Sequence, residues 1–174
     1  MIRTISQLSD NSEDWNNILL FTSAALSKNK NCVIHYLNEP ERQGATPQEA
    51  AKLWREKIVG LRRKGVKFVG PACASDGNGE QWIREFLTLV KEDVWEGEEP
   101  DFLGVHYYGE SWEEAVEYLK RVNDRFPERK MVASEIGCTS RSYEEVVRFT
   151  GRLCNCKSFV QYRKEMFETS WACC

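Results

Sequence analysis

Short apolar runs alternate with longer runs of helical period along the chain, and this alternation constrains the fold more than any other feature. Alternation of this kind is typical of β/α units and a parallel sheet. The runs that predict strands cover residues 32–37, 66–71, 101–108 and 131–136, with a short one at 1–5 and a last one within 158–172. The resulting six strands and five helices fit both a doubly wound open sheet and an incomplete (β/α)8 barrel.

Helix start signals stand between the predicted strands. Thr46 and Glu49 have the spacing of a capping box, Pro47 takes the first helical position, and the helix is predicted to end at Gly65. Trp54 and Trp82 lie on apolar helical stripes, so we expect both in the core. Three further pairs with the capping-box spacing mark helix starts: Asp10 with Glu13, Ser111 with Glu114, and Ser142 with Glu145.

Charge and hydropathy exclude several classes of partner. The 174 residues include 24 Lys and Arg against 27 Asp and Glu, a net charge of −3, so we expect no nucleic-acid partner. No apolar run approaches the ~20 residues that span a bilayer, so we expect no membrane partner. The first fifteen residues contain no apolar segment of a signal peptide, so nothing in the chain as written predicts export.

Neither a nucleotide cofactor nor a metal is expected. The segment Gly77-Asn78-Gly79 follows a predicted strand but lacks the third glycine of a dinucleotide-binding turn. The chain has seven cysteines and two histidines, and their spacing does not suit a tetrahedral zinc site. We therefore expect no cofactor and no metal, and the cysteines leave the compartment open.

Polar residues gather where the predicted strands end. In parallel α/β folds the active site forms at the C-terminal ends of the strands. The residues found there are Asn38 and Glu39 after one strand, His106, Tyr107 and Tyr108 after another, and Glu135 after a third.

Two glutamates at strand ends are what glycoside hydrolysis requires. One carboxyl donates a proton to the leaving oxygen, and the other acts as nucleophile or base; a separation of roughly 5 Å gives retention and more than ~6.5 Å gives inversion. Asn38 could hydrogen-bond a sugar hydroxyl, and aromatic rings could stack on sugar C–H faces. Structural interpretations also fit: Glu39 as a turn residue, Glu135 in an ion pair, and His106 as a hydrogen-bonded structural residue.

The order of the motifs resembles glycoside hydrolase family 128, which includes the fungal alkali-sensitive linkage proteins of the cell wall. The resemblance covers roughly residues 32–150. The matching segments are Leu37-Asn38-Glu39-Pro40-Glu41, residues 47–54, Gly70-Pro71-Ala72, residues 101–109 and Ser134-Glu135-Ile136-Gly137.

This resemblance implies a retaining (β/α)8-barrel enzyme that acts on β-1,3-glucan in endo mode. It implies that Glu39 is the acid/base and Glu135 the nucleophile. It also implies an extracellular or cell-wall location, with a β-glucan polysaccharide as the partner; the oligomeric state is left open. The residues implied to bind the sugar are Asn38, His106, Tyr107, Tyr108 and, at the end of the eighth strand, Trp171.

The resemblance also implies that residues 1–174 form a single glycosyl hydrolase catalytic domain that is incomplete at its N-terminus. Asn38 and Glu39 would end strand four, so residues 1–5 would form strand three, and a full barrel takes ~250 residues. We expect such a chain to be weakly stable and to hydrolyse little. Two other functions stay open: a degenerate, non-hydrolytic glucan-binding protein, and an intracellular α/β domain that binds a protein partner.

Overall fold

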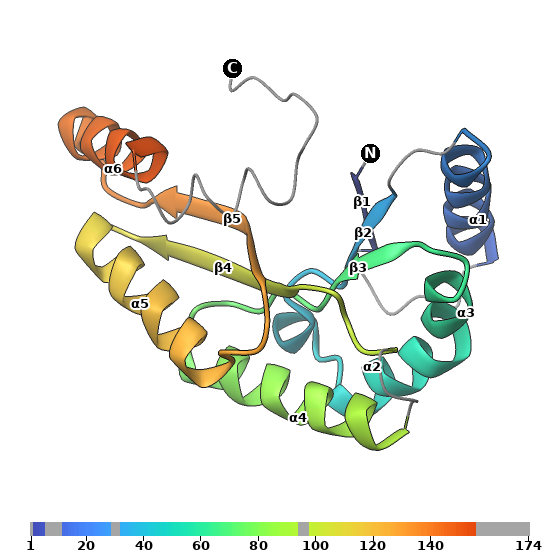
Figure 1. Ribbon diagram of the computed structural model, residues 1–174. Coiled ribbons are helices and arrows are strands. Elements are labelled where there is room, and N and C mark those ends of the chain that lie inside the picture. The colour runs from blue at the N-terminus through green and yellow to red at the C-terminus, as the bar shows by residue number, and fades with distance from the viewer. Residues whose placement is uncertain (1, 6–11, 29–31, 94–97, 156–174) are drawn as a thin grey trace. The chain divides into compact units, whose positions relative to one another are not determined.

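The computed structural model describes residues 2–5, 12–28, 32–93 and 98–155, in which strands and helices alternate. This order confirms the predicted β/α alternation, and the last predicted strand, within 158–172, lies outside the described residues. The elements are β1 (Ile2–Ile5), α1 (Ser12–Leu26), β2 (Val33–Tyr36), α2 (Pro47–Leu53), α3 (Val59–Arg62), β3 (Lys67–Val69), α4 (Gly77–Asp93), β4 (Leu103–Gly109), α5 (Trp112–Arg125), β5 (Met131–Cys138) and α6 (Tyr143–Asn155) (Figure 1).

The chain divides into two compact units. Unit 1 comprises residues 1–106 and 128–134, and unit 2 comprises residues 107–127 and 135–174. The division passes through β4 and β5, so each unit holds part of both strands. No helix in the described part of the chain has the length and apolar character needed to cross a membrane.

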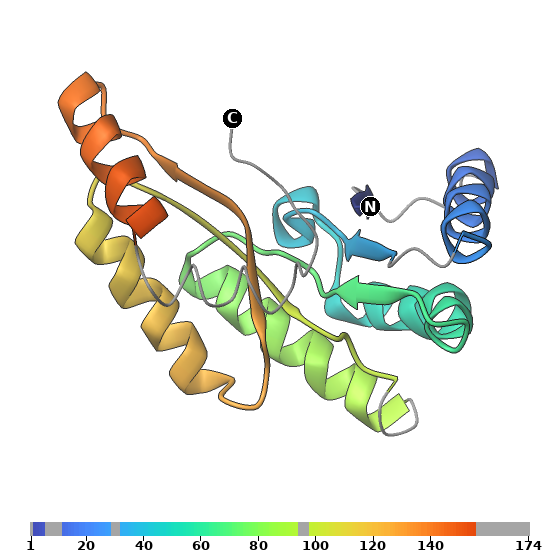
Figure 2. The ribbon, with the colours of Figure 1, turned by 45° about the horizontal axis from the view of Figure 1, so that its top comes forward.

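The strands of unit 1 lie beside one another in chain order. β1 pairs in parallel with β2, and β2 with β3, as Figures 1 and 2 show. Parallel bridges join Val69 to Phe102 and Cys73 to Val105, and the Leu103 N–H donates to the Lys130 carbonyl at 2.8 Å. A doubly wound sheet reverses its strand order, whereas a (β/α)8 barrel keeps it. The described strands therefore follow the barrel order, and β1 has no second neighbour among them.

The helix that follows β2 begins at the predicted cap. The Thr46 hydroxyl accepts from the Glu49 N–H, and the Glu49 carboxylate accepts from the Thr46 N–H at 2.9 Å. These hydrogen bonds lower the pKa of Glu49. α2 continues through a π-helical turn at Trp54–Ile58 into α3, which ends at Arg62 just before the left-handed Gly65 (φ 91°).

An aromatic cluster forms the core between the sheet and the helices of unit 1. Trp54 is fully buried, with ring centroids 5.0 Å from Tyr36 and 5.6 Å from Phe68. Trp82 stacks on Phe86 at 5.7 Å, and α2 packs along α4. Both tryptophans were predicted in the core, and this is confirmed. Their indole N–H groups donate to the backbone carbonyls of Glu98 and Ala45, so no polar atom of either ring is left unsatisfied.

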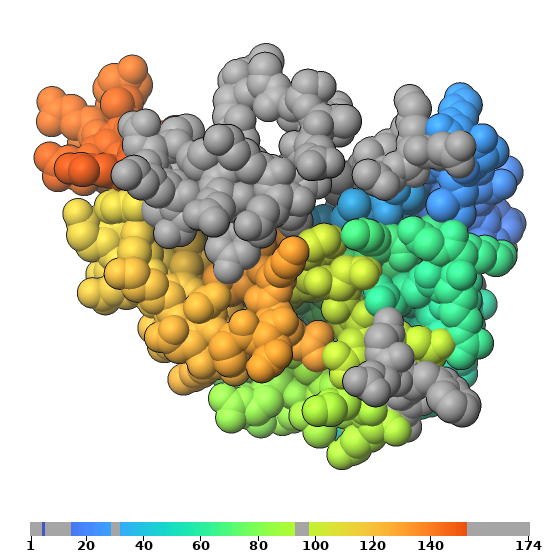
Figure 3. Space-filling model, viewed as in Figure 1, coloured from blue at the N-terminus to red at the C-terminus, as the bar shows by residue number. Residues whose placement is uncertain are grey.

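Unit 2 is built around α5, which packs against α6. The Ser111 hydroxyl caps α5 by accepting from the Glu114 N–H, as predicted. Ala115, Tyr118 and Val122 line the buried side of the helix at helical spacing. The outward side of α5 carries charged residues and forms part of the surface of this unit, in yellow in Figure 3.

Candidate active site

The backbone around Glu39 is unusual, because Leu37 (φ 58°) and Glu39 (φ 41°) both take left-handed conformations. Asn38, which lies between them, forms a parallel β-bridge with Ala72. The Ala72 N–H donates to the Leu37 carbonyl, and the Glu39 N–H donates to the Ala72 carbonyl at 2.8 Å. A buried, branched side chain with positive φ is rare, and such strain of about 1–3 kcal/mol per residue tends to cluster at functional sites. Because of this kink, the Glu39 side chain does not continue the alternation of side-chain directions along β2.

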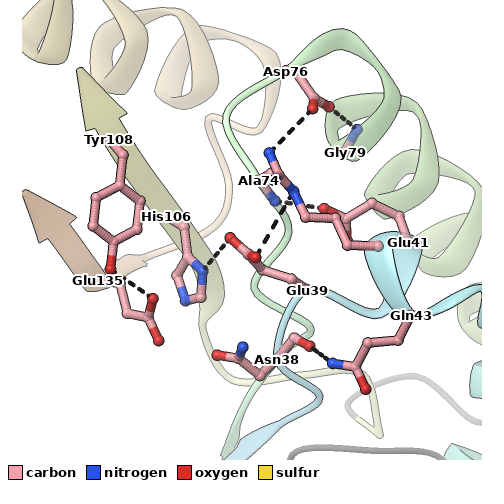
Figure 4. A network of polar contacts seen from close by, with 11 residues as sticks. Asn38, Glu39, Glu41, Gln43, Ala74, Asp76, Gly79, His106, Tyr108 and Glu135 are labelled. Atoms are coloured by element: carbon pink, nitrogen blue, oxygen red, sulfur yellow. Dashed lines mark hydrogen bonds and ion pairs between the residues drawn. The ribbon is translucent and has the colours of Figure 1, made fainter. Parts of the chain in front are cut away.

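The Glu39 carboxylate lies against a buried histidine of unit 1. His106 Nδ1 lies 3.2 Å from Glu39 Oε1, as the dashed line in Figure 4 marks, and His106 is only 1% exposed. The other ring nitrogen, Nε2, lies 3.1 Å from the Ser134 hydroxyl. The imidazole is thus contacted at one nitrogen by the loop after β2 and at the other by a residue within β5.

A second set of contacts supports the Glu39 loop. Arg42 Nε lies 3.8 Å from Glu39 Oε2, and the Arg42 guanidinium also reaches Asp76 at 3.6 Å. The Asp76 carboxylate accepts from the Gly79 N–H in the first turn of α4 (Figure 4). The loop after β2 is therefore tied to the N-terminus of α4 through one arginine.

Beneath this loop, Glu41 and Cys73 are packed together. Glu41 Oε1 accepts from the Ala74 N–H at 2.7 Å, and its Oε2 is buried without a hydrogen-bond partner. Burial, followed by the nearby charges of Glu41 and Glu39, raises the pKa of the Cys73 thiol. Cys73 therefore stays a protonated thiol at neutral pH and acts as packing rather than as a nucleophile.

The second predicted glutamate, Glu135, has its own partner in unit 2. The Tyr108 hydroxyl donates to Glu135 Oε2 at 2.9 Å (Figure 4). The Tyr108 ring passes so close to β5 that a Cβ at Gly137 would lie 2.9 Å from ring carbon Cε1. The glycine two residues after Glu135 thus gives the tyrosine room to reach the carboxylate.

The other residues predicted to bind the sugar do not share one environment. Tyr107 is buried in unit 2 against Tyr118 and Phe149, and its hydroxyl donates to Glu114 at 3.4 Å. Burial raises the pKa of Tyr107, and the neighbouring Glu114 carboxylate raises it further. Asn38 is half-buried, and its carbonyl accepts from the Gln43 amide. Trp171 lies outside the described residues.

The structure thus brings Glu39 to His106 and Glu135 to Tyr108. Glu39 belongs to unit 1 and Glu135 to unit 2, so the separation of the two carboxyls stays a prediction. Ser134 and Arg42 were given no role from the sequence; the only signal was that each lies close in sequence to a predicted glutamate. No group of three or more His, Cys, Asp or Glu side chains in the described ranges could hold a metal ion.

Residues 4–169 match the family model of a glycosyl hydrolase catalytic core. Among solved structures, a GH128 subgroup VI exo-β-1,3-glucanase from Aureobasidium namibiae is 36% identical with a TM-score of 0.74, over 87% of this chain and 57% of that one. A sequence search of curated proteins found no match.

Two further structures share the fold at lower identity. A GH128 subgroup IV endo-β-1,3-glucanase from Lentinula edodes is 24% identical with a TM-score of 0.70, over 91% of this chain and 58% of that one. A GH128 subgroup I endo-β-1,3-glucanase from Amycolatopsis mediterranei, in complex with laminaritriose, is 22% identical with a TM-score of 0.66, over 91% of this chain and 67% of that one. The chain therefore spans under two thirds of the Aureobasidium and Lentinula proteins.

Proposed function

Because the chain belongs to the glycosyl hydrolase catalytic core family, we propose that it is the catalytic part of a retaining β-1,3-glucanase of the GH128 type. In this proposal Glu39 is the acid/base and Glu135 the nucleophile. The five described strands would be five consecutive strands of a (β/α)8 barrel, from the third to the seventh.

One observation carries the proposal: Glu39 follows β2, Glu135 lies within β5, and each glutamate contacts a different side chain of β4. His106 contacts Glu39, and Tyr108 contacts Glu135. Alternate residues of a strand project to the same face, so the proposal assigns both carboxyls to one rim. It predicts a carboxyl separation of about 5 Å, the spacing of retaining enzymes.

The proposed reaction has two steps, and the two carboxyls have different roles in each. Glu39 transfers its proton to the glycosidic oxygen as the Glu135 carboxylate attacks the anomeric carbon, so one C–O bond breaks and a glycosyl ester forms. Water then attacks the same carbon, Glu39 removes its proton, and the Glu135 carboxylate is released. In this proposal the hydrogen bond from the Tyr108 hydroxyl to Oε2 orients the Glu135 carboxylate for the attack.

The contacts of Glu39 suit its double role. His106 lies at Oε1 and the Arg42 guanidinium at Oε2, so both carboxyl oxygens have a neighbour that fixes their position. The left-handed kinks at Leu37 and Glu39 hold the carboxyl in place before substrate arrives, and such preorganisation reduces the cost of reaching the transition state.

We propose that the substrate is a β-1,3-glucan and that the enzyme acts outside the cell or in the cell wall. The solved Amycolatopsis relative holds a laminaritriose, which is a fragment of such a glucan. The Tyr108 ring, 53% exposed, offers an aromatic face to a sugar. We also propose that Asn38 hydrogen-bonds the sugar, whereas the buried Tyr107 supports the core.

The test is hydrolysis of laminarin by residues 1–174, alone and extended at the N-terminus by the first two β/α units of the Aureobasidium enzyme. Proton NMR should show the β-anomer as the first product, and the product lengths separate endo cleavage from exo cleavage.

Three variants sharpen this test. Glu135→Gln should abolish turnover and keep most of the glucan affinity, whereas Glu144→Gln, at an exposed site on α6, is the matched control and should be fully active. Glu39→Gln should be slow on laminarin. Affinity without release of sugar in every version would support the non-hydrolytic glucan-binding alternative and overturn the proposal.

A further inference from the structure

We infer that Glu41 is a positioning residue, whose side chain holds the left-handed turn that carries Glu39. The inference rests on the proposed role of Glu39 as acid/base. Glu41 lies in the short 3-10 helix Pro40–Gln43, and its Oε1 accepts from the Ala74 N–H at 2.7 Å, as the dashed line in Figure 4 marks. Ala74 is buried, so its N–H depends on an acceptor from the protein.

The neighbouring hydrogen bonds show which acceptor the Ala74 N–H would have in a regular sheet. The Ala72 N–H donates to the Leu37 carbonyl, and the Glu39 N–H donates to the Ala72 carbonyl, which is the pattern of a parallel ladder. Two residues further along, the same pattern would join the Ala74 N–H to the Glu39 carbonyl. That carbonyl instead accepts from the Arg42 N–H at 3.1 Å, because the chain turns into the 3-10 helix.

The Glu41 side chain replaces the hydrogen bond that the ladder loses at this turn. Its Oε1 takes the place of the Glu39 carbonyl as the acceptor for Ala74, so the turn stays attached to the segment after β3. This attachment matters because the left-handed conformations of Leu37 and Glu39 persist only where surrounding contacts enforce them. Glu41 and Glu39 are two residues apart in one turn, so the bond to Ala74 fixes the direction of the Glu39 side chain.

The other oxygen of Glu41 shows that a carboxyl at this position has a cost. Oε2 is buried and has no hydrogen-bond partner among the described residues. A buried polar atom without a partner lowers stability, and such atoms are few in folded proteins. Cys73 beside it offers only a weak thiol donor, so the bond to the buried Ala74 N–H is the contact that accounts for the carboxyl.

Three variants separate positioning from a general loss of stability. Glu41→Gln keeps a side-chain carbonyl that can accept from Ala74, whereas Glu41→Leu removes the acceptor and keeps most of the side-chain volume. Thr46→Ala is the matched control, because it removes the cap of α2 by breaking the hydrogen bonds with Glu49 and leaves the bond to Ala74 in place.

Amide hydrogen exchange, followed by NMR on residues 1–174 without substrate, measures the stability of the turn. In Glu41→Leu the amides of Ala74 and Glu39 should exchange about 10-fold faster, while the amide of Lys67, at the start of the same ladder, should change no more than in the control. In Glu41→Gln the rates should stay within about 3-fold of the unsubstituted protein. Equal acceleration at all three amides would indicate a general loss of stability and overturn the inference.

Kinetics in the version that hydrolyses laminarin test the link to catalysis. A displaced acid should slow cleavage of a laminarin oligosaccharide, whose leaving sugar needs a proton, more than cleavage of a dinitrophenyl β-laminaribioside, whose leaving group needs almost none. We expect Glu41→Leu to lower kcat/KM about 10-fold on the first substrate, the size of one lost hydrogen bond, and less than about 2-fold on the second. Glu41→Gln should restore most of the loss, and Thr46→Ala should leave the ratio of the two values unchanged.

Equal losses on both substrates in Glu41→Leu, or a Glu41→Gln variant as slow as Glu41→Leu, would overturn the inference. Failure of the proposed function would be recognised separately. Glu39→Gln would then show no preference for the activated substrate, whatever the exchange rates of the Ala74 and Glu39 amides.

Discussion

Replacing Tyr108 with phenylalanine tests the proposed role of Glu135 as nucleophile, because it removes one oxygen atom that contacts this carboxylate. The substitution removes the hydroxyl that donates to Glu135 Oε2 at 2.9 Å and keeps the ring that packs beside Gly137. The carboxylate of Glu135 then has to be oriented without this hydrogen bond. We expect slower attack on the anomeric carbon and little change in the fold.

The size of the effect follows from the type of hydrogen bond and its exposure. A hydrogen bond to a charged acceptor contributes about 1.5–3 kcal/mol. Tyr108 is 53% exposed, so water replaces part of the lost interaction. The remaining loss of transition-state stabilisation is about 1–2 kcal/mol. At 1.36 kcal/mol per factor of ten, kcat/KM should fall roughly 5- to 30-fold.

The assay measures kcat/KM on a laminarin oligosaccharide with the version of the protein that hydrolyses laminarin. Tyr143→Phe is the matched control, because Tyr143 is 82% exposed on α6 in the same unit. The control should stay within about twofold of the unsubstituted protein, and the thermal unfolding of both variants should be unchanged. A Tyr108→Phe variant as active as the control would refute the assigned role of Glu135.

Three other perturbations have defined outcomes. Glu39→Gln should regain part of its activity on aryl glycosides with activated leaving groups, which need little protonation; equal loss on both substrates, measured by initial rates, would count against the acid/base role. Trp54→Phe, which loses the hydrogen bond to Glu98, should lower the free energy of unfolding in urea by about 2–3 kcal/mol. Burial raises the pKa of Tyr36 well above its ordinary value, so its contribution to stability is intact below about pH 10 and is lost at higher pH as the unfolded chain ionises. Urea titrations at rising pH should show this loss, and Tyr36→Phe should reduce it.

Much of the fold could be predicted because its signals are local. The capping box of Thr46 and Glu49, the caps at Ser111, and the apolar runs that became β2 to β5 depend on neighbours within a few residues. The choice between a doubly wound sheet and a barrel was not local. It required the bridges from Val69 to Phe102, just before β4, and from Cys73 to Val105 in β4, which show the strands in chain order.

The parts that were not predicted depend on tertiary contacts. Nothing in the sequence marks Leu37 and Glu39 as left-handed, because neither is a glycine or an asparagine, and the pairing with Ala72 imposes the kink. The π-helical turn at Trp54–Ile58 likewise lies within an ordinary helical pattern. The contact of Ser134 with His106 joins residues 28 positions apart.

The most direct test of the account is to trap the covalent intermediate. A fluorosugar analogue of a β-1,3-linked glucose disaccharide, with an activated leaving group, forms a long-lived ester with the nucleophile of a retaining enzyme. After incubation and peptic digestion, tandem mass spectrometry locates the sugar on the chain. The account predicts one label, on Glu135, and none in Glu135→Gln. A label on any other residue, or an unlabelled protein that still hydrolyses laminarin, would contradict it.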